Sequence, residues 1–183
     1  MRKIHIIMLT ALAVSSQWLI NEQMAGNFVT IDEFAHVPAG VSHWELGTYF
    51  VYRENPPLIR SLISLPVLLS RPKTIYTSAR SNVGLRTELA VGADFLMANP
   101  DRYLLLFWRA RLVVMALSLI CGGFIFLWAS ELFGGWAGIA CSALWFVDVN
   151  IIAHSSLATL DVGASLTGLA ATYGFWQFLK KPS

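Results

Sequence analysis

The sequence predicts an all-α polytopic membrane protein, with about four transmembrane helices and amphipathic interfacial helices in a large first external loop. Hydrophobic residues make up 56% of the 183 residues and charged residues only 13%, whereas a soluble domain carries about 25% charged residues. Four stretches approach the roughly 20 mostly apolar residues that a helix needs to cross a bilayer. The net charge of +2 does not indicate a nucleic-acid partner.

The first apolar stretch, residues 4–20, follows Arg2 and Lys3 and has the position of a signal peptide. We interpret it as a membrane span, because the run is long and no A-x-A-like cleavage site follows it. Three further spans are expected at residues 112–130, 136–153 and 162–179. Residues 131–135 then form a tight cytoplasmic turn between the second and third spans.

Basic residues at both ends of the chain predict the orientation of these spans. Arg2 and Lys3 place the N-terminus in the cytoplasm, and Lys180 and Lys181 place the C-terminus there too. The two indications agree if the number of spans is even, as four is. Residues 21–111 then form one external loop, whose many cations do not break the rule, because loops beyond about 60 residues cross regardless of charge. We therefore expect a multi-pass protein of the cell membrane.

The external loop shows helical patterns of its own. Residues 32–47 have apolar side chains at helical spacing, and residues 83–97 form a second such segment that Asn99-Pro100 ends. Residues 58–69 are apolar but too short to span, and they contain Arg60, so we expect a helix that lies in the membrane interface. Residues 71–81 are polar and are expected to be irregular.

Acidic residues on the expected outer side are the first candidates for chemistry. Asp32 and Glu33 lie about a dozen residues past the first span, and Asp161 lies at the outer entrance of the fourth. Carboxylates that converge in a semi-apolar cleft are candidates for general-base or metal work. Simpler readings stay open: a solvated Asp-Glu pair, Asp161 at the N-terminal turn of a helix, and Asp148 as a polar contact between helices.

The basic and imidazole groups also allow two readings. Arg109 and Arg111 either anchor the second span by reaching to the interface, or hold an anionic head group beside the acids. The spacing of His36, His43 and His154 is not that of a metal site, so no zinc site is assigned.

Three segments together resemble a known family. The stretch DEFAHVPAGVSHWELGTYFVYRENPPLIRSLISLPVLL, residues 32–69, resembles the first external loop of protein O-mannosyltransferase-like glycosyltransferases of the type C superfamily. Residues 110–135 and 153–162 are similar to the family's entry to the second span and to its Thr-x-Asp segment. The sequence departs from the family at Asn55, where many relatives have His. It also resembles only the N-terminal part of these enzymes, which have many more spans.

The resemblance implies a membrane glycosyltransferase. The donor would be a polyprenyl-phosphate sugar, the acceptor a hydroxyl of a protein or glycan on the external face, and the transfer inverting. Asp32 would act as the base with Glu33 beside it, and Asp161 would orient the acceptor or help to hold a divalent metal; no other cofactor is assigned. The candidates for binding the lipid phosphate are three cations on the expected outer side, Arg60, Arg109 and Arg111. Three further polar residues complete the predicted substrate-binding set: His36, Asn55 and His154.

The sequence is also compatible with other classes of function. The chain could be a non-catalytic truncated fragment, because four spans do not easily surround a polyprenyl donor. It could also be a lipid-head-group-binding or scaffold protein that acts with a second membrane chain. A small transporter or channel is less favoured, because the acids lie at the outer surface rather than in the middle of the spans.

Overall fold

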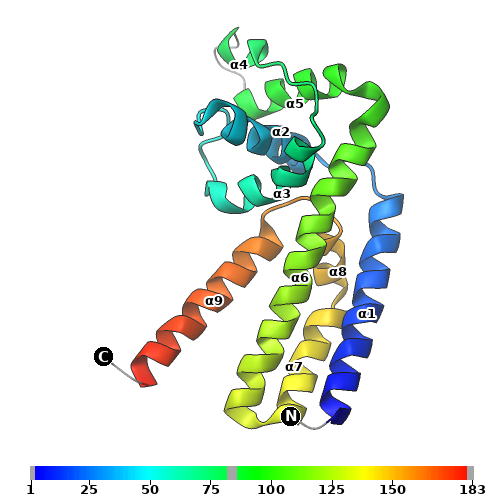
Figure 1. Ribbon diagram of the computed structural model, residues 1–183, viewed down its shortest axis with the longest axis vertical. Helices are drawn as coiled ribbons and strands as arrows, with labels where there is room; N and C mark the ends of the chain where they lie inside the picture. The colour runs from blue at the N-terminus through cyan, green and yellow to red at the C-terminus, as the bar shows by residue number, and fades with distance from the viewer. Residues whose placement is uncertain (1–2, 82–85, 181–183) are drawn as a thin grey trace. The chain divides into compact units, whose positions relative to one another are not determined.

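The computed structural model describes residues 3–81 and 86–180, and over these ranges its regular structure is entirely helical (Figure 1). The all-α prediction is thereby confirmed. The helices are α1 (Lys3–Gly26), α2 (Ile31–Leu46), α3 (Pro57–Leu69), α4 (Thr77–Ser81), α5 (Thr87–Ala98), the short 3₁₀ helix η1 (Pro100–Arg102), α6 (Tyr103–Phe133), α7 (Gly135–Val147), α8 (Val149–Ser155) and α9 (Asp161–Lys180).

The chain folds into two compact units. The first, which we call the span unit, consists of Met1–Gln23, Met115–Ser156 and Asp161–Ser183. The second, which we call the loop unit, consists of Met24–Val114 and Leu157–Leu160. The loop unit therefore contains nearly all of the segment that the sequence predicts as an external loop, including α2 to α5.

Two helical stretches are long and apolar enough to cross a membrane: α1, and the stretch Pro100–Phe133 that contains α6. The pair α7 and α8 adds a third if it counts as one span, although the two helices are bent by 61°. The described part of the chain thus offers two or three candidate spans. The predicted fourth span lies in α9, which is helical over its whole length but is not among these candidates.

The bend between α7 and α8 has a local cause. Asp148 has an extended backbone, with φ −66° and ψ 126°, and its Oδ1 accepts hydrogen bonds from the backbone N–H groups of Asn150 and Ile151 at 2.8 and 3.0 Å. Asp148 is therefore the N-cap of α8, which is a favoured position for aspartate. The continuous helix predicted over residues 136–153 is corrected by this cap, and so is the reading of Asp148 as a contact between helices.

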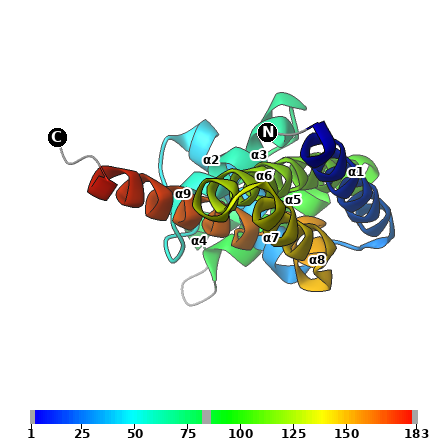
Figure 2. The ribbon, with the colours of Figure 1, turned by 90° about the horizontal axis from the view of Figure 1, so that it is seen from below.

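Close packing in the span unit depends on a glycine. α7 lies beside the span-unit part of α6 in both views (Figure 1, Figure 2). A Cβ added at Gly122 of α6 would stand 2.2 Å from the buried ring of Phe146 on α7. Trp145 also donates its indole N–H to the carbonyl of Ser118 at 3.0 Å. A side chain at Gly122 would thus force the Phe146 ring or the two helices to shift.

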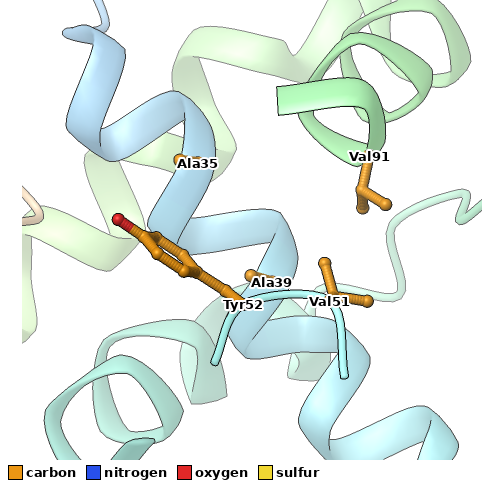
Figure 3. Close-up of a cluster of buried hydrophobic side chains, with 5 residues drawn as sticks. All are labelled: Ala35, Ala39, Val51, Tyr52 and Val91. Carbon is orange, nitrogen blue, oxygen red and sulfur yellow. The ribbon is translucent and has the colours of Figure 1, made fainter. Parts of the chain in front are cut away.

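The loop unit is built around α2, of which every residue from Ala35 to His43 is buried. Two small residues one turn apart, Ala35 and Ala39, allow Val51 and Tyr52 of the following loop to lie against the helix, and Val91 of α5 completes this cluster (Figure 3). α2 is also in close contact with α3 and α5. The apolar periodicity of residues 32–47 therefore marks the core of the unit.

Several boundaries differ from the prediction. α4 occupies residues that were expected to be irregular, and α5 begins at Thr87, while residues 82–85 lie outside the described part of the chain. α6 begins at Tyr103, nine residues before the expected start of the second span. Arg109 and Arg111 consequently lie inside a helix rather than in the loop before it. Gly134, with φ 89°, forms the predicted turn after α6.

Candidate functional site

The first turn of α2 holds a carboxylate that is completely enclosed. Thr30 caps the helix, and its hydroxyl and the side chain of Glu33 form a reciprocal capping box. Glu33 is 0% exposed. Its Oε2 accepts hydrogen bonds from the N–H and hydroxyl of Thr30 at 3.0 and 3.1 Å, and its Oε1 accepts one from the N–H of Ala158 at 2.8 Å.

Arg111 of α6 binds the same carboxylate with two parallel hydrogen bonds. Its Nε lies 2.7 Å from Oε1 of Glu33 and its Nη2 lies 2.9 Å from Oε2. The remaining donors of Arg111 bind the carbonyl oxygens of Met24, Asn27 and Phe28 at 2.9–3.1 Å. The guanidinium and the carboxylate are thus both saturated by groups of the loop unit, which is the condition under which a buried ion pair is tolerated.

Asp32 lies next to Glu33 in the sequence but in a different environment. It is exposed, while its neighbour is enclosed. It also lies in the first turn of α2, where the helix dipole favours a carboxylate. The two predicted acids therefore differ in access: the carboxylate of Glu33 has no free lone pair for a substrate, whereas the carboxylate of Asp32 can be reached by a substrate. We assign Glu33 to the positioning of this turn on that ground.

Three of the predicted binding residues meet at a residue that the sequence reasoning missed. The ring of Tyr52 is stacked on His36, with centroids 5.0 Å apart, and on the guanidinium of Arg60 at 4.0 Å. The amide of Asn55 donates to the Tyr52 hydroxyl at 3.3 Å, and so does Nη2 of Arg86. This one side chain thus joins α2, α3, the loop between them and the N-cap residue of α5.

Arg60 is a buried cation in this cluster. It is 0% exposed, and its Nη1 donates to the carbonyl of Tyr52 at 2.7 Å. Burial lowers the pKa of its guanidinium, while the charge of Glu88 acts in the opposite direction. Since no face of Arg60 reaches solvent, its direct use as a phosphate ligand would need the cluster to open.

A hollow of about 600 Å³ lies beside the Tyr52 cluster, in the size range of small-molecule sites. Its walls are residues 50–54 and the start of α5, with Arg86 and Glu88 among them. His36, Asn55 and Arg60 are not part of these walls. No sequence motif marks Tyr52 or Arg86, because their relation exists only after α3 and α5 have packed on α2.

Arg109 also lies in the loop unit, but its surroundings differ from those of Arg60 and Arg111. It is partly buried and donates from Nη1 to the hydroxyl of Ser70, the residue that caps the C-terminus of α3. Arg109 is therefore only partly enclosed. Of the three arginines predicted to bind phosphate, it is the one that solvent reaches.

His154 and Asp161 are brought together in the span unit. His154 Nδ1 lies 3.2 Å from Asp161 Oδ2, and both side chains are more than half exposed. Asp161 is the first residue of α9, so the reading of this carboxylate as part of an N-terminal helical turn is confirmed. The described residues contain no group of three or more His, Cys, Asp or Glu side chains that could hold a metal ion.

One sequence signal distinguishes Glu33 from Asp32. Glu33, Val37 and Val41 follow one another at intervals of four, so they share a face of α2, and all three are buried. The Thr-x-x-Glu pattern at residues 30–33 is in addition the signature of a capping box.

Comparison of the chain with protein-family models, with curated proteins and with solved structures finds no match.

Proposed function

We propose that this chain is part of a membrane glycosyltransferase that transfers a sugar from a polyprenyl-phosphate-sugar donor to an acceptor hydroxyl. The transfer inverts the anomeric carbon, and Asp32 is the base that takes the proton of the acceptor hydroxyl. The loop unit faces the external side of the membrane and both termini face the cytoplasm. The acceptor is a protein or a glycan.

The proposal rests on the difference between Asp32, which is exposed, and Glu33, which is buried and ion-paired. An inverting transfer needs a carboxylate that can approach the acceptor, held in a fixed orientation relative to the sugar. The capping box and the Glu33–Arg111 ion pair fix the first turn of α2 in place. Asp32 lies on the same turn and remains exposed. A merely solvated acid pair does not require a buried arginine to fix one of its two members.

The remaining predicted residues support the same reaction in different ways. Arg109, which is only partly buried, can neutralise charge on the leaving phosphate. Arg60 and Arg111 hold the scaffold through their buried contacts. His154 and Asp161, in the span unit, form an exposed imidazole–carboxylate pair that offers both a donor and acceptors for hydroxyl groups.

The test is sugar transfer by the chain in lipid vesicles, with polyprenyl-phosphate mannose as donor. Asp32→Asn is expected to lower the rate by about 10²–10⁴-fold, the usual contribution of a general base. Asp101→Asn is the matched control, because Asp101 is also an exposed aspartate of the loop unit. An unchanged rate in Asp32→Asn removes Asp32 from the role. Donor binding without turnover by the unaltered chain favours the alternative of a lipid-head-group-binding protein.

A further inference from the structure

α3 has two faces of different character. One face is built into the loop unit and consists of Ile59, Arg60, Ile63, Ser64 and Val67, all buried. It lies directly against α2: a Cβ added at Gly40 would stand 2.5 Å from the carbonyl oxygen of Arg60 and 2.7 Å from Cβ of Ser64. The orientation of α3 about its own axis is therefore fixed by close packing.

The opposite face is a stripe of leucines that the described chain leaves partly exposed. Leu58, Leu62, Leu65 and Leu69 are each between 37% and 75% exposed. A helix turns by about 100° per residue, so these four side chains fall within an arc of about 60° and extend over roughly 16 Å. We call them the leucine face. The other residues of α3 that are not buried are proline, serine and leucine, so this side of the helix carries no charge.

Cations gather at the C-terminal end of the leucine face. Arg102 and Arg109 both donate to Ser70, the first to its carbonyl at 2.9 Å and the second to its hydroxyl. Arg71 and Lys73 follow immediately and are exposed. The backbone of Lys73 is held by Asn99, which accepts from its N–H at 2.9 Å and donates to its carbonyl at 2.8 Å. Two positive charges bound to Ser70 and two exposed ones on the following residues thus lie at the end of an uncharged apolar stripe.

The indole ring of Trp44 lies beside the N-terminal part of the leucine face. Trp44 of α2 is half exposed and donates its indole N–H to the carbonyl of Ser61 at 2.9 Å. Tryptophan is enriched where membrane meets water, because one end of its side chain is apolar and the other polar. An exposed leucine stripe flanked by tryptophan and basic residues is the composition of a helix that lies in a membrane interface.

The sequence already predicts that residues 58–69 lie in the membrane interface. We propose that the leucine face is the surface of α3 that inserts there, and that the cation cluster at its end selects anionic phospholipids. A bilayer is the partner that the chain itself supplies, because α1 and the Pro100–Phe133 stretch are long and apolar enough to place the loop unit at a membrane. The cations specify the sign of the head group, since Arg and Lys beside a membrane surface attract anionic lipids. This inference does not depend on sugar transfer.

The first experiment measures the depth of the leucine face. The full chain, with Cys121→Ala and Cys141→Ser, is placed in nanodiscs of phosphatidylcholine and phosphatidylglycerol, with a nitroxide at Leu62→Cys or at Leu65→Cys. Glu54→Cys, an exposed acidic position of the same unit, is the reference. We expect the labels at 62 and 65 to be accessible to oxygen and protected from a water-soluble nickel complex, and the label at 54 to show the reverse. Labels at 62 and 65 that the nickel complex reaches overturn the proposal, and so does dipolar broadening between copies of the chain, which identifies a second copy as the occupant.

The second experiment measures the choice of lipid. A bimane group at Leu69→Cys is quenched by brominated phosphatidylglycerol or by brominated phosphatidylcholine at equal mole fraction. We expect the anionic lipid to quench about twofold more strongly or better, and this preference to disappear in Arg71→Gln/Lys73→Gln. Lys3→Gln is the matched control, because it removes a cation far from α3 in the sequence and is expected to keep the preference. Equal quenching by both lipids overturns the assignment of anionic selectivity.

Discussion

Replacement of Arg111 by methionine tests whether the first turn of α2 is held in the way that the structure indicates. Arg111 is 3% exposed and Glu33 is 0% exposed. Methionine fills much of the volume of the arginine stem but donates no hydrogen bond. The variant therefore leaves the Glu33 carboxylate without its cation, and the carbonyl oxygens of Met24, Asn27 and Phe28 without their donors.

The size of the effect follows from these contacts. Removal of one partner of a buried ion pair costs about 3–5 kcal/mol, because the other charge remains in a medium that solvates it poorly. The N–H groups of Thr30 and Ala158 still bind the carboxylate. We therefore expect a loss near the lower end, about 3 kcal/mol in the free energy of unfolding, which is more than a hundredfold in the equilibrium constant.

The assay is reversible unfolding of the purified chain in mixed micelles, followed by circular dichroism. Arg109→Met is the matched control, since Arg109 lies two residues earlier on α6, is partly exposed and has a hydrogen bond to Ser70. The control should lose no more than about 1.5 kcal/mol, the value of an ordinary hydrogen bond. The double variant Glu33→Met/Arg111→Met should be more stable than the sum of its single variants predicts, because it leaves no charge unpaired.

Two outcomes would refute the reasoning. If Arg111→Met unfolds within about 1 kcal/mol of the unaltered chain, the pair is not the buried contact that stabilises this turn. If the effects of Glu33→Met and Arg111→Met simply add, the two side chains do not interact energetically. In either case the proposed separation of roles between Glu33 and Asp32 would lose its physical basis.

Two further predictions concern stability. Burial, together with the positive charge of Arg60, lowers the pKa of His43 from 6.5 to about 4, so folding favours the neutral imidazole; the chain should lose on the order of 2 kcal/mol as the pH falls from 6.5 towards 4, and His43→Gln should flatten this part of the stability profile. Gly122→Ala should destabilise the chain by about 1–3 kcal/mol in thermal unfolding, because the added methyl group meets the buried ring of Phe146. Gly123→Ala, at which nothing lies within 4 Å of the added Cβ, should be close to neutral, and equal effects at the two glycines would contradict the packing of α6 on α7.

Local patterns were sufficient to predict the helical class and several of the elements. The apolar spacing of residues 32–47 corresponds to α2, and the run at 58–69 corresponds to α3. The Thr-x-x-Glu pattern at residues 30–33, which was not among the predicted features, also marks the N-terminus of α2. These features depend on neighbours within one or two turns, so the sequence alone contains them. The break at Asp148 was missed because one capping side chain interrupted an otherwise continuous apolar run.

The partners of the buried polar groups were decided only by the tertiary structure. Glu33 meets Arg111 across 78 residues of the chain and Ala158 across 125. Tyr52 joins residues of two helices and the N-cap residue of a third, Arg86, although no motif distinguishes it in the sequence. Periodicity predicts which side of a helix is buried, but the choice of partner depends on how far apart the backbones stand once the helices have packed. For that reason the sequence by itself determined that Glu33 lies on the buried face of α2 and Asp32 beside it, and only the fold decided that Arg111 and Ala158 are the groups that enclose Glu33.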